Sequence, residues 1–229
     1  MAERVQKIDV RGGYDRWSTI YDQRPSALVA LDRRHTMRRL DPQKGERVLD
    51  AGCGTGAHLE SIHRAGAGAM GLDVSVGMLA VARARESELS LVQADLDQPL
   101  PLRPGHFDAV LCSLVSEHLA NLESFFAATF DVLRGGGRLV FAAFHPEMAA
   151  AGVEANFELE GTEYRLGAEL YTTRAYLEAI GTAGFEDCAV REFEVDADLV
   201  REAPSAAKHL GRPLLLLIEA RRPGGVERV

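Results

Sequence analysis

A short glycine-rich segment carries the strongest chemical signal in the chain. Residues 48–56 read Val-Leu-Asp-Ala-Gly-Cys-Gly-Thr-Gly, so an apolar run enters a turn with glycine at positions 52, 54 and 56. A strand, a glycine turn and the first turn of a helix allow backbone to approach a ligand closely. The glycines by themselves are equally compatible with a tight turn that binds nothing.

Asp50, immediately before this turn, indicates which kind of ligand the loop accepts. A carboxylate is repelled by a pyrophosphate in a crevice of low dielectric constant, whereas an ammonium group attracts it. The spacing G-x-G-x-G also lacks the further offset of the dinucleotide fingerprint. Cys53 is interpreted as a small turn residue rather than a nucleophile. We therefore predict that Asp50, Ala51 and the glycines Gly52, Gly54 and Gly56 bind a ligand with a cationic amino-acid end.

Two further acids follow the next two predicted strands. Asp73 ends the second strand, where its carboxylate is suited to accept hydrogen bonds from two ribose hydroxyls or to cap a helix. Asp95 and Leu96 follow the third strand, where an acid can accept from an adenine amino group while leucine packs on the ring; Asp97 is an alternative in the same loop. The carboxyl ends of parallel strands meet at one crevice. A ligand with an amino acid, a ribose and an adenine matches this order.

The elements that position these residues alternate along the chain. Strands are predicted at 46–51, up to Asp73, at 90–93, at 107–113 and at 138–144. Helices are predicted at 58–64, from the N-cap Ser75 to 86, and from the N-cap Asn121 to 134, where Gly135, Gly136 and Gly137 end the helix. This alternation predicts an α/β fold with a parallel sheet, right-handed crossovers and helices on both faces.

The outer segments depart from this alternation. Residues 14–40 are expected to form one or two helices broken near Pro25, and 145–171 a cap with a small hairpin about Gly161 and Thr162. A helix from Thr172 or Thr173 to 181–184, strands at 189–195 and 214–220, and a frayed tail at 221–229 complete the chain. We divide a single domain, 1–229, into a helical lid (1–45), a cofactor-binding core (46–144), a cap insertion (145–171) and a C-terminal part (172–229).

Five segments resemble the successive motifs of the class I S-adenosylmethionine-dependent methyltransferases: VLDAGCGTG, GLDVSVGML, QADLDQPLPL, FDAVLCSLVSEHL and LRGGGRLVF. The similarity is greatest to the ubiquinone/menaquinone-methylase-like small-molecule branch and covers about residues 47–144. It implies a Rossmann-like, seven-stranded, mostly parallel sheet with an antiparallel last strand. It also implies S-adenosylmethionine as cofactor and S-adenosylhomocysteine as product.

The resemblance also assigns contacts to the cofactor. The glycine loop is expected to surround the methionine part, and Asp73 and Asp95 to hold ribose and adenine. Met78 corresponds to a position that packs on the adenine, and Ser113 to one at the methionine end. We add Val74, beside Asp73, and Tyr21, because related enzymes often carry a lid tyrosine that touches the cofactor.

Few residues are candidates for assisting methyl transfer. The reaction is an in-line displacement, so the protein mainly positions the acceptor, and a base is needed only for weakly acidic acceptors. His118 is a candidate for that base, since its ordinary pKa lies near neutrality, or else it contacts the cofactor or caps the helix. His145 is expected to face the same crevice as base or substrate contact, or else to satisfy backbone at the start of the cap; Glu117 is expected to contact substrate. No ligand spacing supports a metal between His118, His145 and Glu147, so none is predicted.

Three aromatic residues precede the core. Tyr14, Trp17 and Tyr21 follow i, i+3, i+7 spacing and therefore share one helix face. They either pack against the domain or close over cofactor and acceptor, where aromatic faces tolerate a cationic sulfonium. In the second case Tyr14 and Trp17 contact the acceptor.

Composition limits the partners. The chain has 229 residues, 46% of them hydrophobic, and a formal net charge of −8, which disfavours nucleic acid. An Asn/Asp-Pro-Pro-Tyr/Phe motif, typical of amino-methylating nucleic-acid enzymes, is absent at residues 113–116. The apolar run 214–218 is too short to span a bilayer, and the cysteines Cys53, Cys112 and Cys188 form no ligand or disulfide pattern. A cytoplasmic protein without membrane or nucleic-acid partner, monomeric or homodimeric, is predicted.

One basic stretch runs against the net charge. It is interpreted as a solvated helix face or as a contact for an anionic ligand, and consists of Arg24, Arg33, Arg34, Arg38, Arg39, Lys44 and Arg47.

The resulting hypothesis is methyl transfer from S-adenosylmethionine to a small molecule, with the acceptor atom left open among oxygen, nitrogen and carbon. A protein acceptor is a further alternative. One rival is an NAD(P)-dependent oxidoreductase, which Asp50, the loop spacing and the absence of a Tyr-x-x-x-Lys pair disfavour. The other is a methyltransferase-like module that binds the cofactor without turnover, which the sequence leaves open.

Overall fold

The computed structural model describes residues 4–23 and 26–224 and contains two β-sheets. The predicted helix break at Pro25, the basic residue Arg24 and the tail from 225 to 229 lie outside the described residues. One sheet has seven strands and forms the centre of the chain, and the other has three strands.

The seven-stranded sheet has the order β4-β3-β2-β5-β6-β10-β9. Its strands are β2 (Arg47–Ala51), β3 (Gly68–Asp73), β4 (Ser90–Gln93), β5 (Phe107–Ser113), β6 (Leu133–Phe144), β9 (Glu186–Glu194) and β10 (Pro213–Arg221). Strands β2 to β6 run parallel, and β10 runs antiparallel to both β6 and β9. The predicted fold class and the antiparallel last strand are confirmed. The order reverses between β2 and β5, which is where open sheets of this kind bind ligands.

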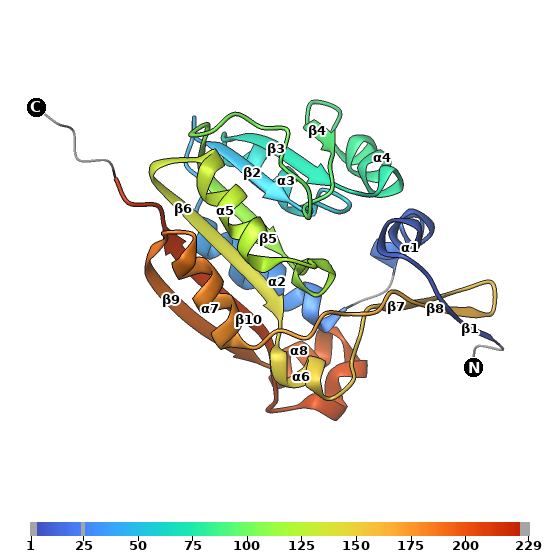
Figure 1. The fold of residues 1–229 in the computed structure, drawn as a ribbon. Coiled ribbons are helices and arrows are strands. Elements are labelled where there is room, and N and C mark those ends of the chain that lie inside the picture. The colour runs from blue at the N-terminus through green and yellow to red at the C-terminus, as the bar shows by residue number, and fades with distance from the viewer. Residues whose placement is uncertain (1–3, 24–25, 225–229) are drawn as a thin grey trace, which may run out of the picture.

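Helices cover both faces of this sheet, as Figure 1 shows. Helices α2 (Ala27–Leu40) and α3 (Ala57–Arg64) lie on one face, and α5 (Leu122–Val132) and α7 (Thr173–Thr182) on the other. Helix α4 (Val76–Arg85) follows β3. Ser75 and Asn121 each accept a backbone hydrogen bond at the start of the next helix, so these two predicted caps are confirmed. Thr172 caps α7, which was expected to start at Thr172 or Thr173.

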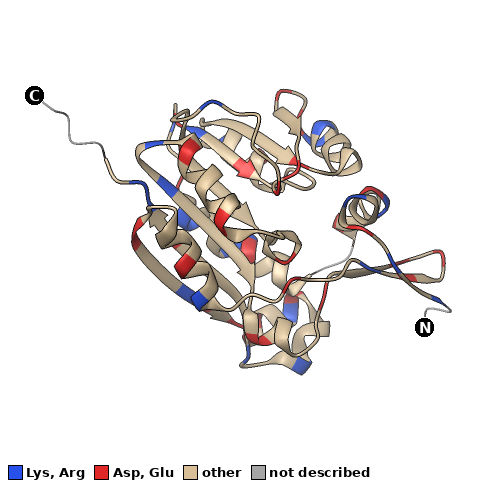
Figure 2. Cartoon of the chain, in the orientation of Figure 1, with Lys and Arg blue, Asp and Glu red and all other residues tan. Residues whose placement is uncertain are grey.

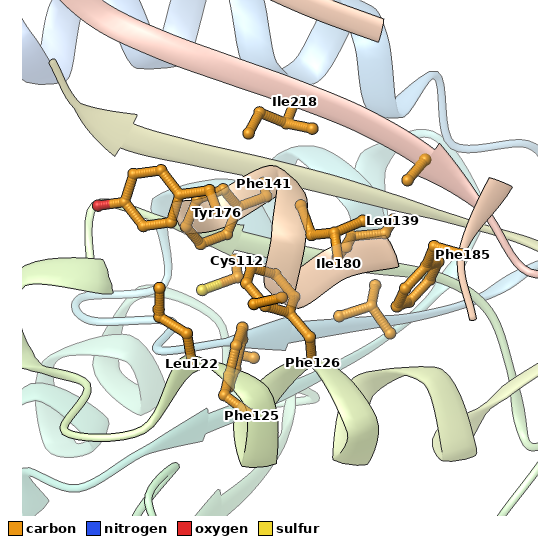
Figure 3. Close-up of a cluster of buried hydrophobic side chains, with 14 of the residues drawn as sticks. Cys112, Leu122, Phe125, Phe126, Leu139, Phe141, Tyr176, Ile180, Phe185 and Ile218 are labelled. Atoms are coloured by element: carbon orange, nitrogen blue, oxygen red, sulfur yellow. The ribbon is translucent and has the colours of Figure 1, made fainter. Parts of the chain in front are cut away.

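The largest hydrophobic cluster lies between α5, α7 and the sheet (Figure 3). Phe125, Phe126 and Phe141 are completely buried, and Phe126 meets the other two rings edge-on at centroid distances of 5.2 Å and 5.1 Å. A second cluster on the opposite face joins Leu40 of α2 and Ile62 of α3 to the strands. Because both faces are covered, the central strands are apolar throughout rather than alternating.

The junction of α5 and β6 differs from the prediction. We expected helix to Arg134, a glycine stop and a strand from Arg138; instead α5 ends at Val132 and β6 begins at Leu133, with a register shift against β5 between Phe107 and Ala109. The guanidinium of Arg222 donates to the carbonyls of Phe130 and Leu133, each at 2.7 Å, and so ends the helix early. The three glycines form the irregular first part of the strand.

The smaller sheet joins the start of the chain to the cap. It consists of β1 (Arg4–Lys7), β8 (Thr162–Arg165) and β7 (Asn156–Leu159), in that order. The hairpin β7–β8, with its turn at Glu160 and Gly161, confirms the predicted hairpin. The parallel pairing of β1 with β8 was not predicted. In Figure 1 this sheet and helix α1 (Val10–Trp17) project from the same side of the central body.

Several short helical segments were not predicted as separate elements. They are η1 (Tyr21–Gln23), η2 (Ser116–His118), α6 (Pro146–Ala150), α8 (Ala197–Glu202) and η3 (Pro204–His209). Residues of α2, α6 and α8 share an apolar cluster with β10 that includes Leu31, Met148, Leu199 and Leu215. None of the helices in the described ranges combines the length and apolarity that crossing a membrane requires.

Truncation of the central aromatic ring tests the packing. Phe126→Ala is expected to lower the free energy of unfolding by about 3–5 kcal/mol, because the lost ring leaves a cavity that the surrounding rings fill only partly. Urea unfolding followed by circular dichroism measures the change. Leu170→Ala, at a side chain that is 65% exposed, is the control and is expected to change stability by less than about 0.5 kcal/mol. Equal effects of the two substitutions would contradict the packing described.

Candidate functional site

A cavity of about 350 Å³ opens at the carboxyl ends of the parallel strands. It lies at the switch point between β2 and β5, between the glycine loop and the N-terminal helices. The residues predicted from sequence that line it are Tyr14, Tyr21, Gly52, Gly54, Asp73, Val74, Asp95, Leu96, Ser113 and His118. The structure therefore brings together residues that are spread over about half of the sequence.

The three glycines of the loop play different parts. Gly52 has φ 84°, and a Cβ there would lie 2.3 Å from the Cγ2 atom of Val115. Gly54, with φ 51°, has nothing within 4 Å of a Cβ and lines the cavity, so its backbone is accessible to a ligand. Gly56 starts α3, and a Cβ there would lie 2.9 Å from the Cβ of Ala82 in α4. Gly56 therefore permits helix packing and does not line the cavity, contrary to the expectation.

Asp73 accepts hydrogen bonds from the backbone of the glycine loop and of the turn that follows β3. Its Oδ2 accepts a hydrogen bond from the backbone N–H of Gly54, and its Oδ1 accepts one from that of Ser75, each at 2.8 Å. Burial raises the pKa of this carboxyl, and the two backbone hydrogen bonds oppose the rise. A carboxylate has about four lone-pair sites. Asp73 thus braces the loop and still presents acceptors to the cavity.

Asp95 and Asp97 differ in their hydrogen bonds. Both residues line the cavity, but Asp97 accepts backbone hydrogen bonds from Ala120 at 2.9 Å and from Asn121 at 3.3 Å. Asp97 thereby holds the start of α5. Asp95 is exposed, and only its Oδ1 is engaged, by the backbone N–H of Asp97 at 3.0 Å. Asp95 is the acid left to meet a ligand.

Asp50 lies deeper than expected. The residue is 1% exposed and does not line the cavity, because it lies within the buried strand β2. Within the described part of the chain its Oδ2 has no hydrogen-bond partner. Burial raises its pKa to about 7, with Asp32 and Asp73 adding to the rise and His58 opposing it. Burying a carboxylate oxygen without a hydrogen-bond partner costs free energy of folding. This atom therefore fits a site that receives an N–H donor from a ligand.

A buried polar network that the sequence did not reveal lies beside Asp50. Asp32 of α2 is 3% exposed and receives hydrogen bonds from Thr36, Ser113 and His58. Asp32, His58 and Ser113 all line the cavity. The only sequence signals are an acid within a helix that must bury one face and a histidine two residues beyond the last glycine. Neither predicts that they meet.

His118 is paired with the lid. Its Nε2 lies 2.9 Å from the Tyr14 hydroxyl, and the two rings meet edge-on at 5.3 Å between centroids. Burial lowers the pKa of His118 to about 4, and burial also raises the pKa of Tyr14 well above its usual value. The pair is therefore neutral at physiological pH, and its members share one hydrogen bond in either imidazole tautomer.

The aromatic residues of the N-terminal segment cluster, although they do not occupy one helix. Helix α1 ends at Trp17, and Tyr21 begins η1, so the prediction of a single helical face is wrong. The Trp17 ring stacks on Tyr14 at 5.7 Å and on Phe157 of β7 at 5.0 Å. Trp17 is thus held between lid and cap and does not line the cavity.

Helix α1 docks on the first turn of α4. The Asp15 Oδ1 accepts hydrogen bonds from the Ser75 hydroxyl at 2.6 Å and from the Gly77 N–H at 2.9 Å. A Cβ at Gly77 would lie 2.7 Å from the Ser18 Oγ and 2.9 Å from the Asp15 carbonyl oxygen. The absence of a side chain at Gly77 therefore allows the lid to approach the core this closely.

Four other expected site residues lie outside the cavity lining. Ala51 and Met78 are buried in the core, with exposures of 0% and 1%. Glu117 lies in η2 with its Oε2 buried and unpaired, and burial raises its pKa to about 7. His145 caps α6, where its Nδ1 accepts from the Glu147 N–H at 3.3 Å.

The position of His145 agrees with the alternative considered for it, the satisfaction of backbone at the start of the cap. Its Nε2 lies 3.3 Å from Glu192 Oε1 in β9, away from the crevice. Among the residues that the structure describes, no group of three or more His, Cys, Asp or Glu side chains is arranged to hold a metal ion.

Comparison with known proteins agrees with this geometry. Residues 49–141 match the family model described as a methyltransferase domain. The segment carries a methyltransferase domain. This match confirms the resemblance to class I S-adenosylmethionine-dependent methyltransferases.

Individual relatives extend the comparison. A demethylmenaquinone methyltransferase of Tropheryma whipplei is 34% identical over 149 residues, which make up 62% of this chain and 62% of that protein. An 18S rRNA (guanine-N(7))-methyltransferase of Bos taurus is 30% identical over 164 residues, covering 63% of this chain and 58% of that protein. The chain thus matches less than two thirds of the length of these relatives.

A solved structure shares the fold over most of the chain. An S-adenosylmethionine dependent methyltransferase from Mesorhizobium loti superposes with a TM-score of 0.72 and 27% identity, over 86% of this chain and all of that one. The fold shared with that protein therefore extends beyond residues 49–141.

The docking of the lid is testable through the single tryptophan of the chain. Gly77→Ala is expected to displace α1, because the new methyl group meets the backbone of Asp15 as well as the Ser18 hydroxyl. Trp17 fluorescence should then shift to longer wavelength and become more accessible to acrylamide. Gly181→Ala, at a helical position with open space, is the matched control. Unchanged Trp17 emission in Gly77→Ala would show that α1 does not dock there.

Proposed function

We propose that this protein transfers a methyl group from S-adenosylmethionine to a small-molecule acceptor. One observation carries the proposal. A single cavity joins a glycine loop whose backbone is open at Gly54 to two acids, Asp73 and Asp95, on the turns after β3 and β4. A ligand with an amino-acid end, a ribose and an adenine presents donors in that order.

The residues fit this cofactor. Asp73 would accept from the ribose hydroxyls, and Asp95 with Leu96 would meet the adenine. The buried, unpaired Oδ2 of Asp50 beneath the loop suits a site approached by an ammonium group. A pyrophosphate would instead face the acids Asp50 and Asp73, and this like-charge repulsion disfavours a nicotinamide dinucleotide. When bound, the cofactor supplies the electrophilic methyl group and its own leaving group.

The chain's own residues enclose and orient the reactants. Tyr14 and Tyr21 of the lid and Leu119 of the core line the cavity and exclude water from it. Burial holds the pKa of His118 near 4, so its imidazole is neutral at physiological pH and binds a proton less tightly than an ordinary histidine does. The Tyr14 hydroxyl, 2.9 Å from Nε2, orients that ring. An acceptor hydroxyl or amine that displaced Tyr14 would find a base already deprotonated.

A small-molecule acceptor is favoured over RNA, although one relative is named for an rRNA. The net charge is −8, and Figure 2 shows Lys and Arg interspersed with Asp and Glu along the ribbon. Within the basic stretch, Arg33 pairs with Asp22 at 3.2 Å and Arg34 with Glu202 at 2.7 Å. Paired cations offer less to phosphates. The relative named for demethylmenaquinone supports a small acceptor.

Calorimetric titration of the purified protein tests the cofactor assignment. S-adenosylmethionine and S-adenosylhomocysteine are expected to bind in the micromolar range, and NADH is expected not to bind. In Asp73→Asn, affinity for S-adenosylhomocysteine should fall by roughly 1–3 kcal/mol, the scale of losing a charged hydrogen-bond acceptor. Glu219→Gln, on the surface of β10, is the control. Binding of NADH alone would contradict the cofactor assignment and favour an NAD(P)-dependent oxidoreductase.

The role of His118 is tested by turnover with labelled methyl donor and a panel of phenols, amines and carboxylates. His118→Gln is expected to leave S-adenosylhomocysteine affinity within about twofold of wild type and to reduce kcat by about 10²–10⁴-fold if proton removal is needed. Because the pKa of His118 lies near 4, wild-type rates should show no inflection from this residue between about pH 5.5 and 8. Equal rates of variant and wild type at every pH would remove His118 from the mechanism. Lack of turnover with every acceptor, despite cofactor binding, would favour a module without catalysis.

A further inference from the structure

The buried acid Asp32 connects three elements at one end of the cavity. It lies on α2, and its partners come from α2 itself, from α3 and from the end of β5. Its Oδ1 receives hydrogen bonds from the Thr36 and Ser113 hydroxyls, both at 2.6 Å, and its Oδ2 lies 2.7 Å from the His58 Nε2. Both oxygens of one carboxylate are therefore engaged by donors.

Ionisation of Asp32 determines which way the Ser113 hydroxyl points. Burial disfavours the charge of Asp32, but the hydrogen bond from His58 and those from Ser113 and Thr36 lower its pKa overall. An ionised carboxylate only accepts hydrogen bonds, so the single hydroxyl proton of Ser113 must be donated to it. The Ser113 oxygen is then left with lone pairs alone for any other partner in the cavity that it lines.

The same carboxylate favours the protonated form of His58 on the other side. Burial works against the charge of His58, but the hydrogen bond to Asp32 and the nearby charges of Asp32 and Asp50 raise its pKa overall. The His58 side chain is 12% exposed and lines the cavity. Asp32 thus leaves an acceptor at Ser113 and favours protonation of His58 within one cavity.

We propose that Asp32 is a positioning residue for the zwitterionic amino-acid end of the cofactor, acting through Ser113 and His58. This inference rests on the proposed function. Ser113, limited to accepting, suits the ammonium group, and His58 suits the carboxylate. The adenosine end meets other residues, namely Asp73 and Asp95, so Asp32 acts on one half of the ligand only.

Other charged groups surround this network. Arg33 follows Asp32 on α2, lines the cavity and opposes protonation of His58. The charge of His58 lowers the pKa of Asp50 in β2. The charge of Asp32 raises the pKa of the buried Tyr21 hydroxyl in η1. The charges of Asp32 and Asp50 both raise the pKa of the Cys112 thiol in β5. None of these groups hydrogen-bonds Asp32 in the described residues, whereas Ser113 and His58 do.

Two ligands that share the nucleoside and differ in the amino-acid end separate this role from a general structural one. S-adenosylhomocysteine carries the zwitterion, and 5′-methylthioadenosine lacks it. Asp32→Asn should weaken S-adenosylhomocysteine by about tenfold or more, as expected when hydrogen bonds to charged groups are lost, and leave 5′-methylthioadenosine within about twofold of wild type. Calorimetry on the full chain gives both dissociation constants, and circular dichroism checks the fold.

Matched variants keep the test decisive. Thr36→Val removes another hydrogen bond to the same Asp32 oxygen but leaves Ser113 and His58 in place, so both affinities should stay as in wild type. Ser113→Ala should reproduce the selective loss of S-adenosylhomocysteine, and it decides the question if Asp32→Asn does not fold.

Three results would overturn the inference. Equal weakening of both ligands in Asp32→Asn would assign Asp32 a structural role, and unchanged binding of both would remove it from the site. In either case, wild-type binding of S-adenosylhomocysteine leaves the proposed function standing. Failure of the wild type to bind either ligand would instead reject the cofactor assignment, and this proposal with it.

Discussion

The carboxylate of Asp73 ties together the two turns on which the cavity depends. It accepts one backbone hydrogen bond from the glycine loop at Gly54 and one from the following turn at Ser75. Through Ser75 the same turn reaches Asp15 of the lid, because the Ser75 hydroxyl donates to that acid and Asp15 also accepts from Gly77. Two carboxylates, Asp73 and Asp15, therefore link the turns after β2 and β3 to the docked helix α1. Since buried backbone N–H groups must be satisfied, these acids are part of the fold as well as of the proposed cofactor site.

Three carboxyl groups are concentrated at one end of the cavity, in a buried region of a kind that ordinarily holds none. Asp32 and Asp50 are almost completely buried, and the charge of Asp73 adds to the raised pKa of Asp50. Only Asp32 is fully compensated, by His58 and two hydroxyls, while Asp50 keeps an unpaired oxygen and a pKa near 7. Burying unpaired carboxylates costs stability. Such an excess of acceptors at one end of a cavity is expected where a ligand brings the missing donors, and a cationic amino-acid end does so.

Lid and cap behave as one structural unit rather than as two additions to the core. Strand β1 pairs with β8 of the cap hairpin, and Trp17 is stacked between Tyr14 and Phe157. A Cβ at Gly13 would lie 2.9 Å from Leu166, so α1 also packs closely on the segment after the hairpin. Any opening of the cavity on this side must therefore move both segments together, and Tyr14 carries that movement to His118.

The local sequence was sufficient for the sheet, its order of strand and helix, and the helix caps at Ser75 and Asn121, because these follow from apolar runs, glycine turns and side-chain capping within a few residues. It also pointed to the glycine loop and to Asp73, Asp95 and Ser113, which come together in the cavity because parallel strands end at one edge. It did not show that Asp50 and Met78 lie beneath the cavity lining, since the depth of a side chain depends on what packs above it. The Asp32–His58 pair, the Tyr14–His118 hydrogen bond and the β1–β8 pairing join residues 26, 104 and about 158 positions apart. No periodicity encodes such contacts, and only the packing of α1 and α2 against the completed sheet decides them.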